Sequence, residues 1–197
     1  MKYLSIIALL ALSCHSWATD HSIDICYGFG CKQQETIIFD AELATMLSRL
    51  FRPAATSAAQ EREQIARAIA YLERHVGTAV GTDADIGGNF DPDRHYPQRY
   101  QLDCIDESRN TTSYLKYLDR IGLLRWHRVS ARRHRSRFLV DGHWTAVIEE
   151  TSNGKRYAVD SWYHDNGQPP EIQPLDDWLQ RKRPGWLGGV GANRLRW

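Results

Sequence analysis

Hydrophobic residues recur every three or four positions in two stretches of the first half of the chain, the period of one face of an α-helix. The first stretch begins at Asp40 and is ended by Pro53, and the second runs from Ser57 to Val80. The apolar positions are Leu43, Met46, Leu47 and Leu50 in the first, and Ile65, Ala68, Ile69 and Leu72 in the second. The residues expected mostly outside the second apolar face are Glu61, Glu63, Arg67 and Arg74. Both stretches are predicted to be scaffold helices.

The second half of the chain predicts one more long helix and then a sheet. Asp103 is a suitable N-cap for a helix from Cys104 to about Ile121, which Gly122 closes. Strand-like patterns follow at residues 124–130, 138–149 and 156–163, with Asn153-Gly154 expected as the turn between the last two. A short helix around residues 175–181 precedes a glycine-rich tail.

Two segments lack such a pattern. Residues 19–36 are short and turn-rich around two cysteines, and residues 81–99 form a long loop rich in Gly, Asp, Asn and Pro. The spacing of the acidic residues in this loop does not match the EF-hand, so we expect a solvated loop rather than a calcium site. The order of elements predicts an α+β fold, with residues 19–99 and 100–197 forming one compact domain.

The charge balance gives no global attraction to nucleic acid or to an anionic membrane. The chain of 197 residues has 25 Lys and Arg against 24 Asp and Glu. One local basic patch, residues 125–137, holds six arginines and two histidines without a carboxylate. It could contact an anionic polymer or an acidic protein segment, or it could be an exposed β loop balanced by the acidic run of residues 83–93.

The first 18 residues have the features of a secretory signal peptide. Lys2 precedes an apolar run, residues 3–12, that is too short to span a bilayer, and Ser16-Trp17-Ala18 is a small-x-small cleavage site. The protein is therefore expected to be exported, to the periplasm or outside the cell, and nucleic acid is not an expected partner. A competing lipoprotein-like site precedes Cys14, so membrane attachment is expected only if Cys14 is lipidated.

Three cysteines remain after cleavage at Ala18, and an odd number leaves at least one thiol unpaired. Cys26 and Cys31 flank a short loop with two glycines, so a disulfide between them is favoured in an oxidising compartment. Two reduced cysteines, or a redox-active pair, are the alternatives. Their spacing fits no common metal site, and by elimination Cys104 is the free thiol.

Cys104 lies at the predicted start of a helix, where free N–H groups and the helix dipole favour a thiolate, although Asp103 and Asp106 oppose it. His143 and Asp160 lie on the two strands of the predicted hairpin, ten and six residues from its turn. Simple pairing does not place them opposite each other, so a bulge, a longer loop or a diagonal contact is needed. If they meet, nucleophile, base and orienting acid are all present.

An oxyanion could be bound by the backbone N–H of Cys104 and by a second donor from Gln98 or Gln101.

These segments, LDCIDESRN, GHWTAVIEE and GKRYAVDSW, resemble the transglutaminase-like core of the papain-like superfamily. The resemblance covers about residues 100–163 and is closest to the bacterial transglutaminase-like cysteine peptidases, exported enzymes that cut peptide bonds in other proteins. It implies a catalytic helix packed on a small antiparallel sheet and the triad of Cys104, His143 and Asp160. Some members bind calcium through acidic residues beside the cysteine, and Asp103 and Asp106 stand there.

The sequence thus predicts an exported thiol enzyme that attacks an amide carbonyl, as a peptidase, an amidase or a transglutaminase. Its substrate would be a protein or a peptidoglycan peptide, and no cofactor is required, calcium being the one ion considered. The alternative is a non-catalytic envelope protein on the same fold that binds a partner through the arginines of residues 125–137.

Overall fold

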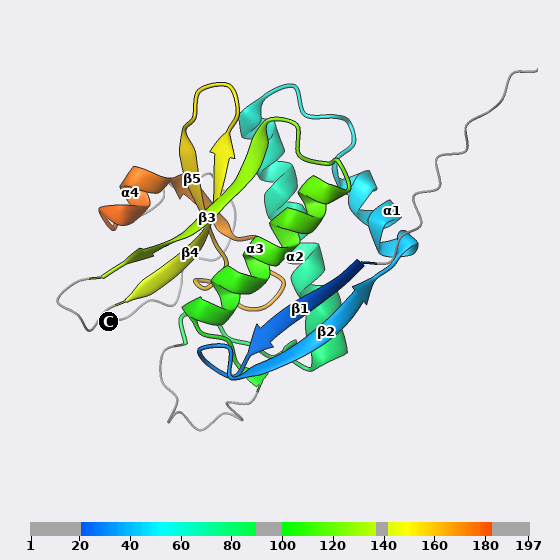
Figure 1. Ribbon diagram of the computed structural model, residues 1–197, viewed down its shortest axis with the longest axis vertical. Helices are drawn as coiled ribbons and strands as arrows, with labels where there is room; N and C mark the ends of the chain where they lie inside the picture. Colours follow the sequence, from blue (N-terminus) through cyan, green and yellow to red (C-terminus); the bar gives the residue numbers. More distant parts are fainter. Residues whose placement is uncertain (1–20, 90–99, 137–141, 183–197) are drawn as a thin grey trace, which may run out of the picture.

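The computed structural model describes residues 21–89, 100–136 and 142–182. In these ranges the chain forms four helices and two small antiparallel sheets, a mixed α+β arrangement (Figure 1). The predicted signal peptide and Cys14 lie outside the described residues. None of the described helices combines the length and the apolar character that a bilayer crossing demands.

The chain begins with a β-hairpin that the sequence did not predict. β1 (His21–Tyr27) pairs with β2 (Gln33–Phe39), and His21 lies opposite Phe39. Alternate residues of β1 face the core, so the strand period was present in the sequence. The expectation of a turn-rich segment was wrong. The turn itself is confined to Gly28 to Cys31, four consecutive residues with positive φ. The glycines and cysteines of this turn led us to predict turns for the short strands on both sides as well.

The helices lie close to their predicted positions. α1 (Ala41–Leu50) and α2 (Ala58–Val80) begin after Asp40 and Ser57, whose side chains accept N–H groups of the first turn. α3 (Cys104–Arg120) and α4 (Leu175–Leu179) follow later in the chain.

One detail of α2 was predicted wrongly, because Glu61 is buried. Its carboxylate accepts the backbone N–H groups of Arg125, Trp126 and His127, and it also bonds the His127 ring at 2.9 Å. This carboxylate attaches α2 to the start of the second sheet.

The second sheet has four antiparallel strands in the order β3-β4-β5-β6. They are β3 (His127–Arg135), β4 (His143–Glu150), β5 (Arg156–Asp160) and β6 (Glu171–Pro174). β3 starts and ends later than predicted, β5 ends three residues earlier than predicted, and β6 was not predicted. The predicted strand residues 138–141 lie outside the described residues.

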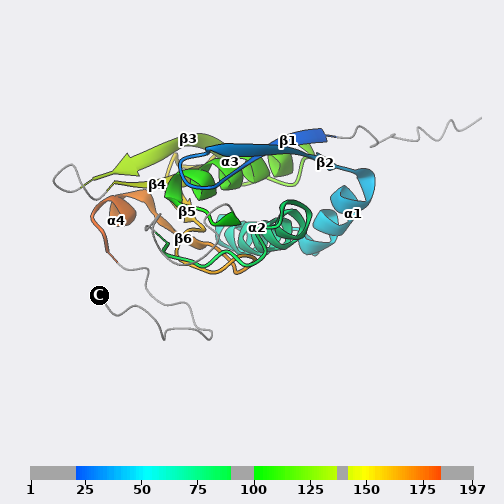
Figure 2. The same ribbon diagram turned by 90° about the horizontal axis from the view of Figure 1, so that it is seen from below.

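α3 lies at the centre of the molecule, between the four-stranded sheet and the β1–β2 hairpin, with α2 packed beneath it (Figures 1 and 2). The main core fills the space between these elements and includes Ile25, Leu72, Leu115 and Ile148. The opposite face of the sheet packs against α4 in a small second cluster of Val147, Ala158, Leu175 and Trp178. Residues near the end of β5 therefore lie between the two packed layers.

Candidate active site

Cys104 is the first residue of α3, and its side chain is buried, with 6% exposed. The preceding Asp103 accepts the N–H groups of Ile105 and Asp106, and Asp106 in turn accepts the N–H of Asp103. This capping box fixes the first turn of the helix and with it the position of the sulfur. As expected from the cysteine count, Cys104 is a free thiol.

The sulfur of Cys104 lies against the backbone on both sides of His143. Sγ is 3.9 Å from the carbonyl oxygen of Gly142, and the N–H of Trp144 is placed to donate to a thiolate. Burial nevertheless raises the pKa of the Cys104 thiol to about 11, and the charges of Asp103 and Asp160 add to the rise. The thiolate expected at the start of this helix is therefore not favoured in the free protein, and the resting thiol holds its proton at neutral pH.

His143 and Asp160 meet directly, with Nε2 of the imidazole 2.7 Å from Oδ2 of the carboxylate. Both side chains are buried, with 4% and 2% exposed. Ala146 pairs with Val159, so one further step of this register places Asp160 opposite Thr145, diagonal to His143.

The diagonal contact follows from the length of the hairpin loop. The N–H of Glu150 donates to the carbonyl of Lys155, and the N–H of Gly154 donates to the carbonyl of Glu150. The loop therefore has four residues, 151–154, and its centre lies before the Asn153-Gly154 pair that the sequence analysis took as the turn. In the observed register, His143 and Asp160 are therefore two positions closer to each other than in the register expected from a turn at Asn153-Gly154.

Aromatic side chains from two segments, α4 and the residues that follow β5, enclose this pair. Trp178 of α4 donates its indole N–H to the same carboxylate oxygen of Asp160, at 2.7 Å. The rings of Trp162, Tyr163 and Trp178 have their centroids 4.8 to 5.5 Å from that of His143. The imidazole is thus held by packing and by one carboxylate, which is itself oriented by an indole.

Nδ1 of His143 is buried and has no hydrogen-bond partner among the described residues. Because Asp160 accepts from Nε2, the neutral ring carries its lone pair on Nδ1. The structure thus joins His143 to Asp160 and sets the Cys104 sulfur beside the His143 backbone. It does not form a hydrogen bond between the sulfur and the ring.

Of the two glutamines expected as oxyanion donors, Gln101 is among the described residues. The amide of Gln101 is buried and is used on the preceding loop, where Nε2 donates to Ala84 at 2.9 Å and Oε1 accepts from Ile86 and Asn89. Gln98 lies outside the described residues.

The loop after α2 is ordered by its acidic and amide groups rather than solvated throughout. Asp85 and Asn89 are buried, and Asp85 accepts the N–H of Leu102 at 2.7 Å. Asp91 and Asp93 of the same predicted loop lie outside the described residues.

The predicted disulfide between Cys26 and Cys31 is present and lies next to the start of α3. Asp106 accepts the N–H groups of Phe29 and Cys31, at 2.9 and 2.5 Å, so the disulfide loop is bound to the helix turn that carries Cys104. No local pattern predicts this contact, because it joins residues that are 77 and 75 positions apart in the chain.

Among the described residues, one group of potential metal ligands comes together: Cys26, Cys31 and Asp106. The two sulfurs are bonded to each other and lack the thiolate charge that metal ions bind. Asp106, considered above as a calcium ligand, is already occupied by backbone N–H groups.

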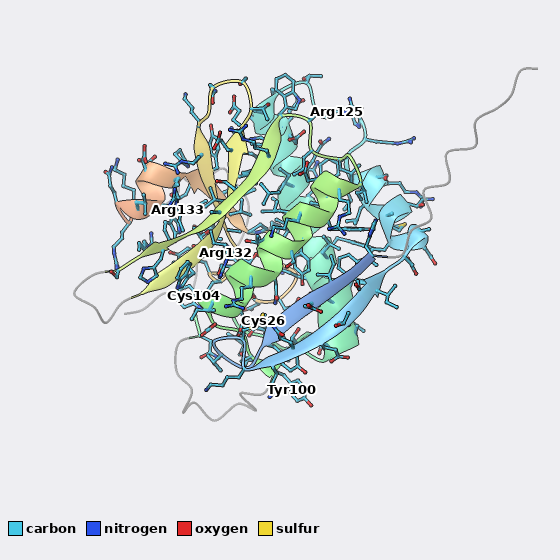
Figure 3. The ribbon with its side chains drawn as sticks, viewed as in Figure 1. Cys26, Tyr100, Cys104, Arg125, Arg132 and Arg133 are labelled. Atoms are coloured by element: carbon cyan, nitrogen blue, oxygen red, sulfur yellow. A yellow bond between two sulfur atoms is a disulfide. The ribbon has the colours of Figure 1, made fainter. Side chains whose placement is uncertain are left out.

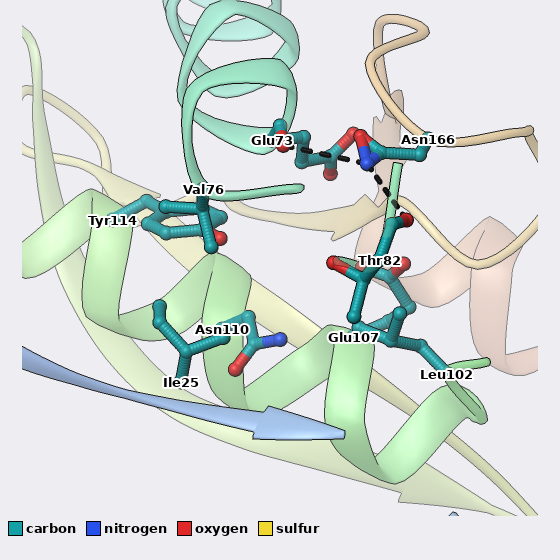
Figure 4. A pocket seen from close by; sticks show the side chains of 9 residues that line it. All are labelled: Ile25, Glu73, Val76, Thr82, Leu102, Glu107, Asn110, Tyr114 and Asn166. Atoms are coloured by element: carbon teal, nitrogen blue, oxygen red, sulfur yellow. Dashed lines mark hydrogen bonds between the residues drawn. The ribbon is translucent and has the colours of Figure 1, made fainter. Parts of the chain in front are cut away.

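A small cavity of about 10 Å³ lies between α2, α3 and β1 (Figure 4), with room for about one water molecule. Its lining includes two buried carboxylates, Glu73 and Glu107. Burial raises the pKa of Glu73 to about 7 and raises that of Glu107 well above its ordinary value. Burial thus favours the protonated form of both carboxyl groups that line this cavity.

Comparison of the chain with protein-family models, with curated proteins and with solved structures found no match.

Proposed function

We propose that the protein is an exported thiol enzyme in which Cys104 attacks the carbonyl carbon of an amide, with His143 as the base and Asp160 as the group that orients it. The observation that carries the proposal is the buried pair of His143 and Asp160. Nδ1 of His143 has no partner among the described residues, and the Cys104 sulfur lies against the backbone beside His143.

The raised pKa of Cys104 favours general-base catalysis over a resting thiolate. The thiol proton, now directed at Gly142, turns to Nδ1, and the sulfur forms a bond to the carbonyl carbon as His143 takes the proton. Catalytic hydrogen bonds are commonly loose in the free enzyme and tighten with substrate. The charge of Asp160 stabilises the imidazolium that results.

The tetrahedral intermediate would place its oxyanion near the first turn of α3. The N–H of Cys104 lies at the N-terminus of that helix, where the backbone donors have no partner within the helix. Collapse of the intermediate transfers the imidazolium proton to the leaving amine and leaves a thioester on Cys104. Water releases the acyl group in a peptidase or amidase, and an amine releases it in a transglutaminase.

Acylation with p-nitrophenyl acetate tests the proposal without knowledge of the natural substrate. We expect release of p-nitrophenol with an acetyl group on Cys104, found by peptide mass mapping, and loss of that adduct in Cys104→Ala. Asp160→Asn should slow acylation, because the carboxylate that sets the tautomer is gone. No adduct on Cys104, or equal rates in wild type, His143→Ala and Asp160→Asn, would leave the non-catalytic binding protein as the better account.

A further inference from the structure

Arg132 occupies an irregular position in β3, beside the candidate active site. The pairing of β3 with β4 shifts between Ser130 and Arg133, so Ala131 and Arg132 form a bulge. A bulge redirects side chains away from the regular alternation of a strand, and such features are over-represented beside active sites.

The guanidinium of Arg132 contacts two residues, Ser108 and Trp144, that lie next to Cys104. Nη1 donates to the Ser108 hydroxyl at 3.1 Å, and the guanidinium carbon lies 5.0 Å from the ring centroid of Trp144. Ser108 is one helical turn beyond Cys104 on the same face of α3. Trp144 is the residue whose backbone N–H faces the sulfur. Figure 3 shows Arg132 and Cys104 toward one end of α3 and Arg125 toward the other.

The charge of Arg132 has no counter-ion in the described part of the chain. No carboxylate there lies within ion-pair distance of it, although the side chain is half-buried. Its charged neighbour is Arg109, an exposed residue of α3, and burial together with that like charge lowers the pKa of Arg132. A half-buried cation is normally paired, so this one is poised to receive an anion.

Two other arginines of the basic patch have partners. Arg128 forms an ion pair with Glu149, and Arg135 donates to Tyr163 and to the backbone of Trp178 while stacking on the Trp178 ring. Those two charges are therefore already engaged. Arg132 has no ion-pair partner among the described residues, and the charged group beside it is Arg109.

We propose that Arg132, with Arg109 beside it, binds an Asp or Glu side chain of a peptide substrate within about two residues of the amide bond that Cys104 attacks. The reach fits, because an extended peptide advances roughly 3.3 Å per residue and one helical turn separates Cys104 from Ser108. This inference rests on the proposed function for the reaction itself, but the recognition of an anion can be measured separately.

The first test compares two alkylating reagents of similar size, anionic iodoacetate and neutral iodoacetamide, with the modified residue identified as Cys104 by peptide mapping. We expect the ratio of the two rates to fall about three- to tenfold in Arg132→Gln, and less in the exposed variant Arg109→Gln. Arg132→Lys should retain most of the ratio. Arg128→Gln, on the same strand but already paired, is the matched control and should leave it unchanged.

The second test asks whether the bound anion is a peptide. Poly-L-glutamate should slow alkylation of Cys104 by iodoacetamide in the wild type and have no effect in Arg132→Gln, whereas heparin should protect much less. An unchanged reagent ratio in both Arg132→Gln and Arg109→Gln would overturn the anion site. Equal protection by heparin would overturn its assignment to an acidic peptide. A failure of the proposed function appears elsewhere, as equal iodoacetamide rates in wild type and His143→Ala.

Discussion

The buried carboxyl of Glu73 predicts that the protein loses stability as the pH rises. Oε2 of Glu73 accepts the N–H of Gly167 at 3.2 Å, while Oε1 and the nearby Oδ1 of Asn166 are buried without a donor. Burial raises the pKa of Glu73 from 4.5 to about 7. A protonated Glu73 supplies a hydrogen that the anion lacks, so the folded state holds this proton more tightly than the unfolded chain.

The sign and size of the effect follow from this difference. The contribution of Glu73 is fully present below about pH 4.5 and is lost as the pH rises through about 7, up to roughly 3 kcal/mol in the free energy of unfolding. Glu73→Gln keeps a donor at every pH. The variant should therefore match the wild type near pH 4.5 and exceed it by about 2 to 3 kcal/mol near pH 8.

Urea denaturation of both proteins at several pH values measures this difference directly. Glu63→Gln is the matched control, because Glu63 is an exposed residue of the same helix and its replacement should leave the pH dependence unchanged. If Glu73→Gln and the wild type lose stability in parallel from pH 5 to about pH 8, the carboxyl is ionised in the folded state and the reasoning from burial is refuted.

Three further variants test the scaffold of the site. Glu61→Ala should lower the free energy of unfolding by about 3 to 5 kcal/mol in urea denaturation, because it leaves buried donors of β3 without an acceptor, and a loss below about 1 kcal/mol would contradict this. Replacement of both Cys26 and Cys31 by serine should cost about 2 kcal/mol, and an unchanged urea midpoint would show that the loop is ordered without the bond. Trp178→Phe removes the indole donor to Asp160 and should slow acylation of Cys104 about tenfold, with wild-type rates arguing that the packed rings alone position the carboxylate.

Local signals in the sequence sufficed for the helices and for the free thiol. Asp103 before an apolar period predicted the start of α3 within its first turn, since capping and helical period depend only on neighbouring residues. The pairing of Cys26 with Cys31 and the isolation of Cys104 followed from short spacing and from an odd count. Each of these inferences uses residues that are close in the chain.

Predictions failed where a residue's environment is set by distant parts of the chain. Glu61 was assigned to the surface because a carboxylate is rarely buried, yet its donors come from a strand start that periodicity alone could not place. The hydrogen bond from the N–H of Cys31 to Asp106 likewise joins two segments that are distant in the chain. The contact of His143 with Asp160 depended on the length of one loop, which shifts the register without changing the strand pattern.

The most direct test of the account is the pH dependence of Cys104 alkylation by iodoacetamide in wild type and in His143→Ala. A thiol of pKa about 11 acting alone is ionised to about one part in ten thousand at pH 7, so its labelling should rise only in strongly alkaline solution. If His143 acts as the base, the wild type is labelled near neutral pH far faster than this fraction allows, and His143→Ala loses the neutral reaction and keeps the alkaline one. Superimposable profiles for the two proteins would contradict the claim that His143 activates Cys104.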